Sequence, residues 1–165
     1  MFAKYSLSFE FFCYSIFFAL LIGAGIIDIQ RMIIPNRLIF YSLIIAILAF
    51  TYNIIRPLAV YGGNGNPFLP LLGLLPGSVF FFLIYVVSLF VFKKDNSIGM
   101  GDIKLLVPIG IILGFDHCLF AVFISVISGG VVGLALIILG IKTRKDSISF
   151  GPFLVICSFV ALLLS

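Results

Sequence analysis

Two aspartates occupy positions where an ionisable side chain is energetically costly. Of the six acidic residues in the chain, Asp28 ends a long run of small and apolar residues, and Asp102 opens another in the sequence Gly99-Met100-Gly101-Asp102. A carboxylate within the apolar layer of a membrane costs about 3 kcal/mol and by default marks a functional site. These two residues are therefore the first candidates for chemistry.

A pair of carboxylates suggests one kind of chemistry in particular. Two that approach closely cannot both ionise, so the pair holds a single proton. One member can then take a proton from water while the other polarises an amide carbonyl, which hydrolyses a peptide bond without a metal or a covalent intermediate. Gly99 and Gly101 fit this interpretation because residues without Cβ let a substrate backbone come close and permit unusual dihedral angles. The simpler interpretation is that they only break a helix.

Composition indicates which elements must position these residues. The chain is 63% hydrophobic and 10% charged, whereas soluble domains carry about 25% charged residues. A membrane-spanning helix needs about 20 apolar residues, so 165 residues predict an all-α, polytopic membrane protein with about six transmembrane helices in a single domain, residues 1–165. The first apolar stretch is longer than a signal-peptide core, and we expect it to remain as the first helix.

Apolar runs and helix breakers give the boundaries of these helices. The predicted spans are residues 7–29, 38–55, 69–92, 103–114, 117–141 and 149–165. At about 1.5 Å per residue the fourth covers under about 20 Å of a core roughly 30 Å thick. It must lie where the bilayer is thin or where other helices shield it, and this predicts a wet site at its N-terminal end.

The distribution of charge predicts the orientation. If the loops alternate between the two sides of the membrane, only Lys4 and Arg56 fall on one side, and the other eight basic residues fall on the opposite side. These eight are Arg31, Arg37, Lys93, Lys94, Lys104, Lys142, Arg144 and Lys145. Positive charge favours the cytoplasm, which predicts both termini outside and both aspartates at the cytoplasmic face of the plasma (inner) membrane. The net charge of +4 thus reflects orientation, and no interleaving of basic and aromatic residues indicates nucleic-acid binding.

Other chemistry finds little support in the sequence. Cys13, Cys118 and Cys157 lie in or beside apolar stretches without the spacing of a zinc or redox pair. The single histidine, His117, follows Asp116 at a predicted helix junction and is interpreted as an interfacial loop residue. We therefore expect no metal site, no cofactor and no disulfide.

Three short motifs together resemble a known family. The sequence GMGDIKLL at residues 99–106 resembles the GxGD signature of the type IV prepilin peptidases, which are intramembrane aspartyl proteases. Asp28-Ile29 followed by IPNRL at residues 34–38 resembles the family's first aspartate motif, and FGPFL at residues 150–154 is similar to a motif near its C-terminus. The motifs occur in the family's order and span almost the whole chain. In this chain Ser149 stands where the family often has proline.

The resemblance implies a fold, a reaction and a substrate. It implies a GxGD aspartyl protease fold with Asp28 and Asp102 as the catalytic pair. The implied substrate is the basic N-terminal leader of type IV pilin-like subunits (prepilins), cut at the cytoplasmic face for pilus or type II secretion-like assembly. Bifunctional members carry an additional N-terminal membrane segment and a cytoplasmic domain. Because this chain starts at the helix of the first aspartate, we expect peptidase activity without N-methyltransferase activity, as in the short peptidases of tight-adherence pili or archaeal preflagellin peptidases.

The remaining motif residues are expected to shape the site. Lys104 lies two positions after Asp102, so on a helix it faces another way and is interpreted as an interfacial anchor. Asn36 is interpreted as the cap of the following helix. Proline without an N–H suits the opening of a helix, so the last helix is expected to begin at Gly151-Pro152. The full set expected to shape the site or bind substrate is Gly99, Gly101, Lys104, Pro35, Asn36, Gly151 and Pro152.

Two other classes of protein were weighed. A small proton-coupled transporter or channel also uses intramembrane carboxylates. Such a protein is expected to place them near mid-membrane and often has two related halves, whereas both aspartates here lie at predicted helix ends and no repeat is visible. A non-enzymatic pilus assembly scaffold would use the aspartates as ion-pair partners of Arg31 or Lys104.

Overall fold

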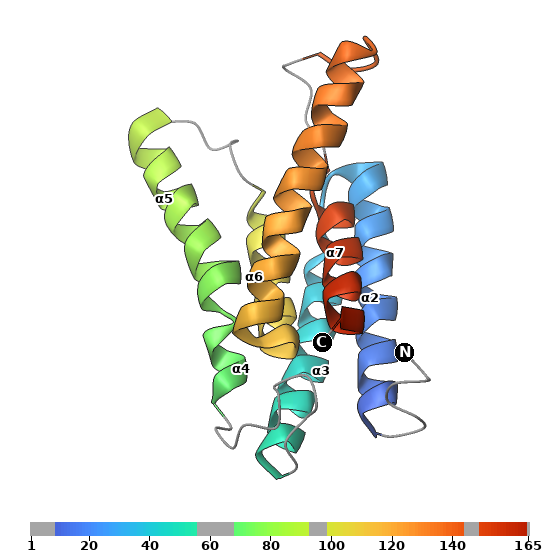
Figure 1. Ribbon diagram of the computed structural model, residues 1–165, viewed down its shortest axis with the longest axis vertical. Coiled ribbons are helices and arrows are strands. Elements are labelled where there is room, and N and C mark those ends of the chain that lie inside the picture. Colours follow the sequence, from blue (N-terminus) through green and yellow to red (C-terminus); the bar gives the residue numbers. More distant parts are fainter. Residues whose placement is uncertain (1–8, 56–67, 93–98, 144–148, 165) are drawn as a thin grey trace.

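The chain folds into a bundle of helices that run up and down past one another (Figure 1). The computed structural model describes residues 9–55, 68–92, 99–143 and 149–164, and within these ranges all regular structure is helical. Three helices could cross a membrane by length and composition, Phe11–Arg31, Asn36–Ile54 and Met100–Ile138, and two shorter apolar helices cover Pro70–Val86 and Gly151–Leu164. The prediction of an all-α, polytopic membrane protein is confirmed.

The first two helices form an antiparallel pair. Helix α2 (Phe9–Arg31) packs against α3 (Asn36–Ile55). Between them the N–H of Met32 donates to the carbonyl of Asp28 at 2.8 Å, and the Pro35 carbonyl accepts from the N–H groups of Leu38 and Ile39 at 3.0 and 3.4 Å. Asn36 is the first residue of α3, and its side-chain oxygen accepts from Lys104 and does not cap the helix as predicted.

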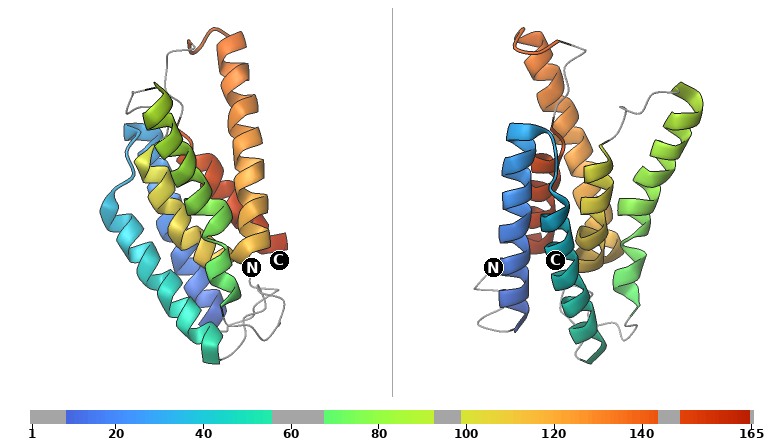
Figure 2. Two further views of the ribbon diagram at one scale, coloured as in Figure 1. Left: turned by 90° about the vertical axis from the view of Figure 1, so that its left-hand side faces the viewer. Right: turned by 180° about the vertical axis from the view of Figure 1, so that it is seen from behind.

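The third predicted span is interrupted. It consists of α4 (Leu69–Leu72), a π-helical turn η2 (Leu75–Val79) and α5 (Phe80–Phe92). The predicted span at residues 69–92 is thus helical, but its helix is irregular near its start. Proline lacks the N–H that an α-helix interior needs, and Pro76 lies within η2. Both α4 and η2 pack on α6, whereas α5 leans away from the bundle above η2 (Figures 1 and 2).

Two glycines let α4 approach α6 closely. A Cβ placed on Gly110 would lie 2.5 Å from the carbonyl oxygen of Gly73, a separation that no side chain tolerates. Without a hydrophobic driving force between helices inside a membrane, small residues at crossings allow close backbone packing. The Gly73–Gly110 contact therefore fixes where α4 crosses α6.

Helix α6 (Met100–Ile138) is two helices joined at Gly114. This glycine has φ 70° and ψ −173°, a backbone conformation that glycine adopts without the steric cost of a Cβ. The first half descends through the bundle and the second half turns back beside it (Figure 2). The two halves correspond to the predicted spans 103–114 and 117–141, and the short first half is shielded by other helices, as its length required. His117 lies in the first turn after the bend, within helix and not in a loop.

The last helix completes the core. Helix α7 (Gly151–Leu164) packs against α6 and α2. Its start at Gly151 agrees with the predicted opening at Gly151-Pro152. One apolar cluster joins α2, α3, α6 and α7, and its largest fully buried side chains include Tyr14, Phe17, Leu105, Ile112 and Leu154. The three cysteines are buried free thiols.

The helix ends predicted to carry positive charge gather at one end of the bundle. The C-terminal ends of α2, α5 and α6 and the N-terminal ends of α3, α6 and α7 all face this side, with α5 set apart and the end of α6 extending furthest (Figure 1). Of the basic residues assigned to this side, four belong to the described residues: Arg31, Arg37, Lys104 and Lys142. The others, Lys93, Lys94, Arg144 and Lys145, lie outside the described residues, as do Lys4 and Arg56 of the opposite side.

Candidate active site

The fold brings the two aspartates together. Asp28 lies in the last turn of α2 and Asp102 in the first turn of α6. Their carboxylates are near enough for their charges to interact. Asp28 is only 6% exposed, and Asp102 is half-buried. Two segments far apart in the sequence thus place a pair of carboxyl groups at one end of the bundle.

Helix α7 holds the Asp28 carboxylate in place. The N–H of Gly151 donates to Asp28 Oδ2 at 3.1 Å, and the hydroxyl of Ser149 donates to the same oxygen at 2.5 Å. Gly151 is the first residue of α7, so its N–H is one of the donors that a helix cannot satisfy internally. The positive end of the helix dipole also favours an anion there. A carboxylate of α2 therefore serves as a cap for α7.

Ser149 was not among the residues predicted from the sequence to shape the site. The available signal was its position just before a predicted helix start, where serine is a favoured capping residue. That signal indicates a local cap, whereas the observed hydroxyl bonds to a residue 121 positions away in the sequence. The partner could be found only from the fold.

The glycine and proline of the FGPFL motif have distinct contacts. A Cβ on Gly151 would lie 2.6 Å from Asp28 Oδ2 and 3.2 Å from its Cγ, so only glycine leaves room for this carboxylate. Pro152 packs on α2, since a Cβ on Gly25 would lie 3.6 Å from Pro152 Cα. The motif thus seats the start of α7 against the helix that carries Asp28.

The two glycines of the GxGD motif also make room for neighbours. A Cβ on Gly99 would lie 2.9 Å from Asp102 Oδ2, and a Cβ on Gly101 would lie 3.2 Å from the Cβ of Ile34. Gly99 has an ordinary extended conformation (φ −66°, ψ 117°), and Gly101 is helical. The expectation of unusual dihedral angles was therefore wrong at both positions, and the required property is the absence of a side chain.

Lys104 and Asn36 link α6 to α3. The Lys104 amine donates to the Asn36 Oδ1 at 3.5 Å, and both side chains are exposed. The scaffold alternative paired an aspartate with Lys104, but this amine contacts Asn36 instead. Beside this contact the first turns of α3 line an open hollow of about 330 Å³, formed by Asn36, Arg37, Phe40 and Tyr41.

The aspartates lie below the end of the longest helix. Helix α7 has 14 residues, whereas the second half of α6 runs over residues 115–138, so at about 1.5 Å per residue it extends roughly 15 Å further. This extension is visible in Figure 1. Near its end Ile138, Leu139 and Ile141 are 83%, 69% and 67% exposed. An apolar surface of this kind suits lipid.

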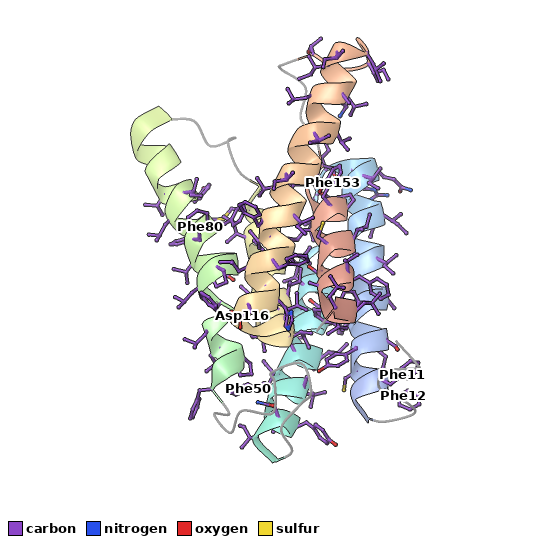
Figure 3. All side chains as sticks on the ribbon, viewed as in Figure 1. Phe11, Phe12, Phe50, Phe80, Asp116 and Phe153 are labelled. Carbon is purple, nitrogen blue, oxygen red and sulfur yellow. The ribbon has the colours of Figure 1, made fainter. Side chains whose placement is uncertain are left out.

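Other ionisable groups lie elsewhere. Asp116 is exposed and lies toward the opposite end of the bundle from Phe153 of α7 (Figure 3). Among residues 9–55, 68–92, 99–143 and 149–164, no three His, Cys, Asp or Glu side chains are grouped as metal ligands would be. The arrangement of Asp28, Asp102 and the start of α7 is suited to acid–base chemistry.

Comparison with known proteins extends the similarity over nearly the whole chain. The prepilin leader peptidase/N-methyltransferase of Bacillus subtilis (strain 168) is 31% identical over 161 residues, which cover 97% of this chain and 58% of that protein. The proteins of the same name from Legionella pneumophila and Aeromonas salmonicida (strain A449) are 31% and 28% identical over 143 residues, covering 87% of this chain and 46% of each relative. The chain thus spans about half the length of these relatives. No solved structure matches it significantly.

The similarity includes the catalytic candidates. The model of the type IV leader peptidase family matches residues 15–134, a range that contains both Asp28 and Asp102. A match over most of the chain, with the motif residues gathered at one end of the bundle, shows that this chain belongs to the type IV leader peptidase family.

Proposed function

We propose that this chain is an aspartic endopeptidase that removes the basic N-terminal leader from prepilin-like precursors, with Asp28 and Asp102 as its catalytic pair. The observation that carries the proposal is the convergence of these two carboxyl groups, from α2 and α6, close enough for their charges to interact. The names of the relatives support the substrate class. The apolar cluster that joins α2, α3, α6 and α7 supports a single peptidase domain.

The reaction needs only the two carboxyl groups and water. One carboxylate takes a proton from water as the water oxygen bonds to the peptide carbonyl carbon, while the other, protonated, gives its proton to the carbonyl oxygen. The C–N bond then breaks as the leaving nitrogen receives the proton held by the first carboxyl. The new acid's hydroxyl returns a proton to the second, so the pair ends as it began. Gly99 leaves space beside Asp102 for its carboxyl group.

The position of the pair suits a substrate with a basic leader and an apolar helix. Arg31 lies in the last turn of α2 with Asp28, and Arg37 in the first turn of α3, which follows directly; such basic residues favour the cytoplasmic side. We infer a multi-pass plasma (inner) membrane location, with both termini outside and the site facing the cytoplasm. A precursor leader held there would lie at the site while its apolar helix stays in the bilayer.

Cleavage in proteoliposomes tests the proposal directly. Wild type, Asp28→Asn and Asp102→Asn would be compared on a pilin-like precursor, with folding verified by thermal unfolding. Asp116→Asn is the matched control, because this carboxylate is exposed and lies toward the other end of the bundle. We expect wild type and Asp116→Asn to release the leader and both other variants to fold without cutting. Normal cleavage by either variant would exclude the dyad, and failure of both variants to fold would favour the scaffold alternative.

A further inference from the structure

Ser149 is a polar residue at the site to which the proposed reaction assigns no role. Its hydroxyl donates to Asp28 Oδ2 at 2.5 Å, and it lies two residues before α7 begins. The family match ends at residue 134, so Ser149 lies in a part of the chain that the match does not cover. The partner carboxylate is buried, which makes the hydrogen bond a large part of its polar surroundings.

We propose that Ser149 is a positioning residue that holds Asp28 ionised and in a fixed orientation, so that Asp28 is the base toward water and Asp102 carries the shared proton. The proposal rests on the proposed function. Asp28 Oδ2 receives two donors, the Ser149 hydroxyl and the Gly151 N–H. A backbone N–H cannot accept a proton, so Oδ2 must act as an acceptor, and Oδ1 is the oxygen left for water.

The surroundings of the two carboxyl groups are therefore unequal. Hydrogen bonds to an ionised oxygen stabilise the charged form, and the N-terminal end of α7 adds a favourable dipole. On α6, Asp102 lies near enough to Asp28 to feel its charge, whereas Lys104 is bonded to Asn36 of α3. Arg31, one turn further along α2, has an exposed side chain. Because the pair holds one proton, the member with two donors stays ionised and the other keeps the proton.

The test compares variants at position 149 whose side chains have a similar shape but differ in whether they carry a hydroxyl group. Ser149→Thr keeps a donor, and Ser149→Val has nearly the shape of threonine but cannot donate. Ser149→Ala removes the group outright. Ser158→Ala is the matched control, because Ser158 is also a buried serine of this region but donates to the Leu154 carbonyl of its own helix at 2.6 Å. If Ser149 only stabilised the helix, Ser149→Ala and Ser158→Ala would change the cleavage rate to the same extent.

Steady-state cleavage of a pilin-like precursor would be measured for these variants together with wild type and Asp28→Asn. A hydrogen bond to a charged group has a strength that corresponds to a change of roughly ten- to a hundredfold, so we expect kcat to fall by about that factor in Ser149→Ala and Ser149→Val, with KM unchanged. Ser149→Thr and Ser158→Ala should stay within about threefold of wild type.

Three outcomes would overturn the inference. They are a Ser149→Val variant as active as Ser149→Thr, a loss confined to KM, or an equal loss in Ser158→Ala. If wild type cuts and Asp28→Asn does not, any of these refutes the role of Ser149 alone. If wild type fails to cut, it is the proposed function that fails.

Discussion

Replacing Gly151 by alanine should separate the geometry of the site from the stability of the fold. The new Cβ would lie 2.6 Å from Asp28 Oδ2, 3.2 Å from Cγ and 3.3 Å from Cβ. Ordinary contacts begin near 3.4 Å, so the carboxylate must move by about 0.8 Å or α7 must shift by a similar amount, and a misplacement of about 1 Å at a catalytic centre can lower the rate roughly a hundredfold. We expect kcat for leader cleavage to fall by about that factor.

Two neighbouring glycines provide controls for this change. A Cβ on Gly23 meets nothing within 4 Å, and a Cβ on Gly25 makes ordinary contacts of 3.6 Å with Pro152 and Val155. Gly23→Ala and Gly25→Ala should therefore cut at nearly the wild-type rate, and Gly23→Ala should raise stability by up to about 1 kcal/mol, because alanine favours helix. Cleavage rate and thermal unfolding would be measured for all three. A Gly151→Ala protein that is folded and fully active would refute the idea that this glycine makes room for the catalytic carboxylate.

Two further predictions concern contacts away from the carboxyl pair. Gly110→Ala should lower the unfolding temperature strongly, because its Cβ would lie 2.5 Å from the Gly73 carbonyl oxygen. Gly130→Ala is the control, because a Cβ there meets nothing within 4 Å, and its unfolding temperature should not fall. Equal unfolding temperatures of the two variants would contradict the close packing of α4 on α6. Lys104→Ala should reduce cleavage by no more than about threefold, since an exposed, long hydrogen bond to Asn36 contributes little, and a hundredfold loss would show that this amine takes part in the reaction.

The helices, and the side of the bundle on which the two aspartates lie, could be predicted from the sequence; the distance between the aspartates could not. Apolar runs mark the segments that must satisfy their own backbone hydrogen bonds in lipid, and alternation of the loops then decides which ends share a side. This reasoning put Asp28 and Asp102 at the same end of the bundle, where their charges are found to interact. It also separated the two halves of α6, because a polar, glycine-containing junction interrupts the apolar run near Gly114.

The features that could not be predicted from the sequence depend on contacts between segments that are far apart in the chain. Hydropathy does not register the break at η2, because the residues on both sides of Pro76 are equally apolar. The glycines at 99 and 101 were expected to permit unusual dihedral angles and the approach of a substrate backbone, but the space that they leave is next to Asp102 and Ile34. Asn36 was expected to cap its own helix and instead accepts from Lys104, 68 positions away. In each case the local pattern was visible, but its partner lies in another helix.

The FGPFL motif at residues 150–154 belongs to this site although it contains no charged residue. The start of α7 contributes a backbone N–H and the space left by a missing Cβ, both directed at Asp28. Its dipole favours the ionised form of that carboxylate. A shift of α7 along α2 would therefore change the environment of Asp28 even if Asp28 and Asp102 kept their positions. The packing of Pro152 and Val155 against Gly25 is thus a condition for the chemistry as well as for the fold. Alanine at position 25 still fits this contact, but a larger side chain there would push α7 along α2 and should lower kcat before it weakens substrate binding.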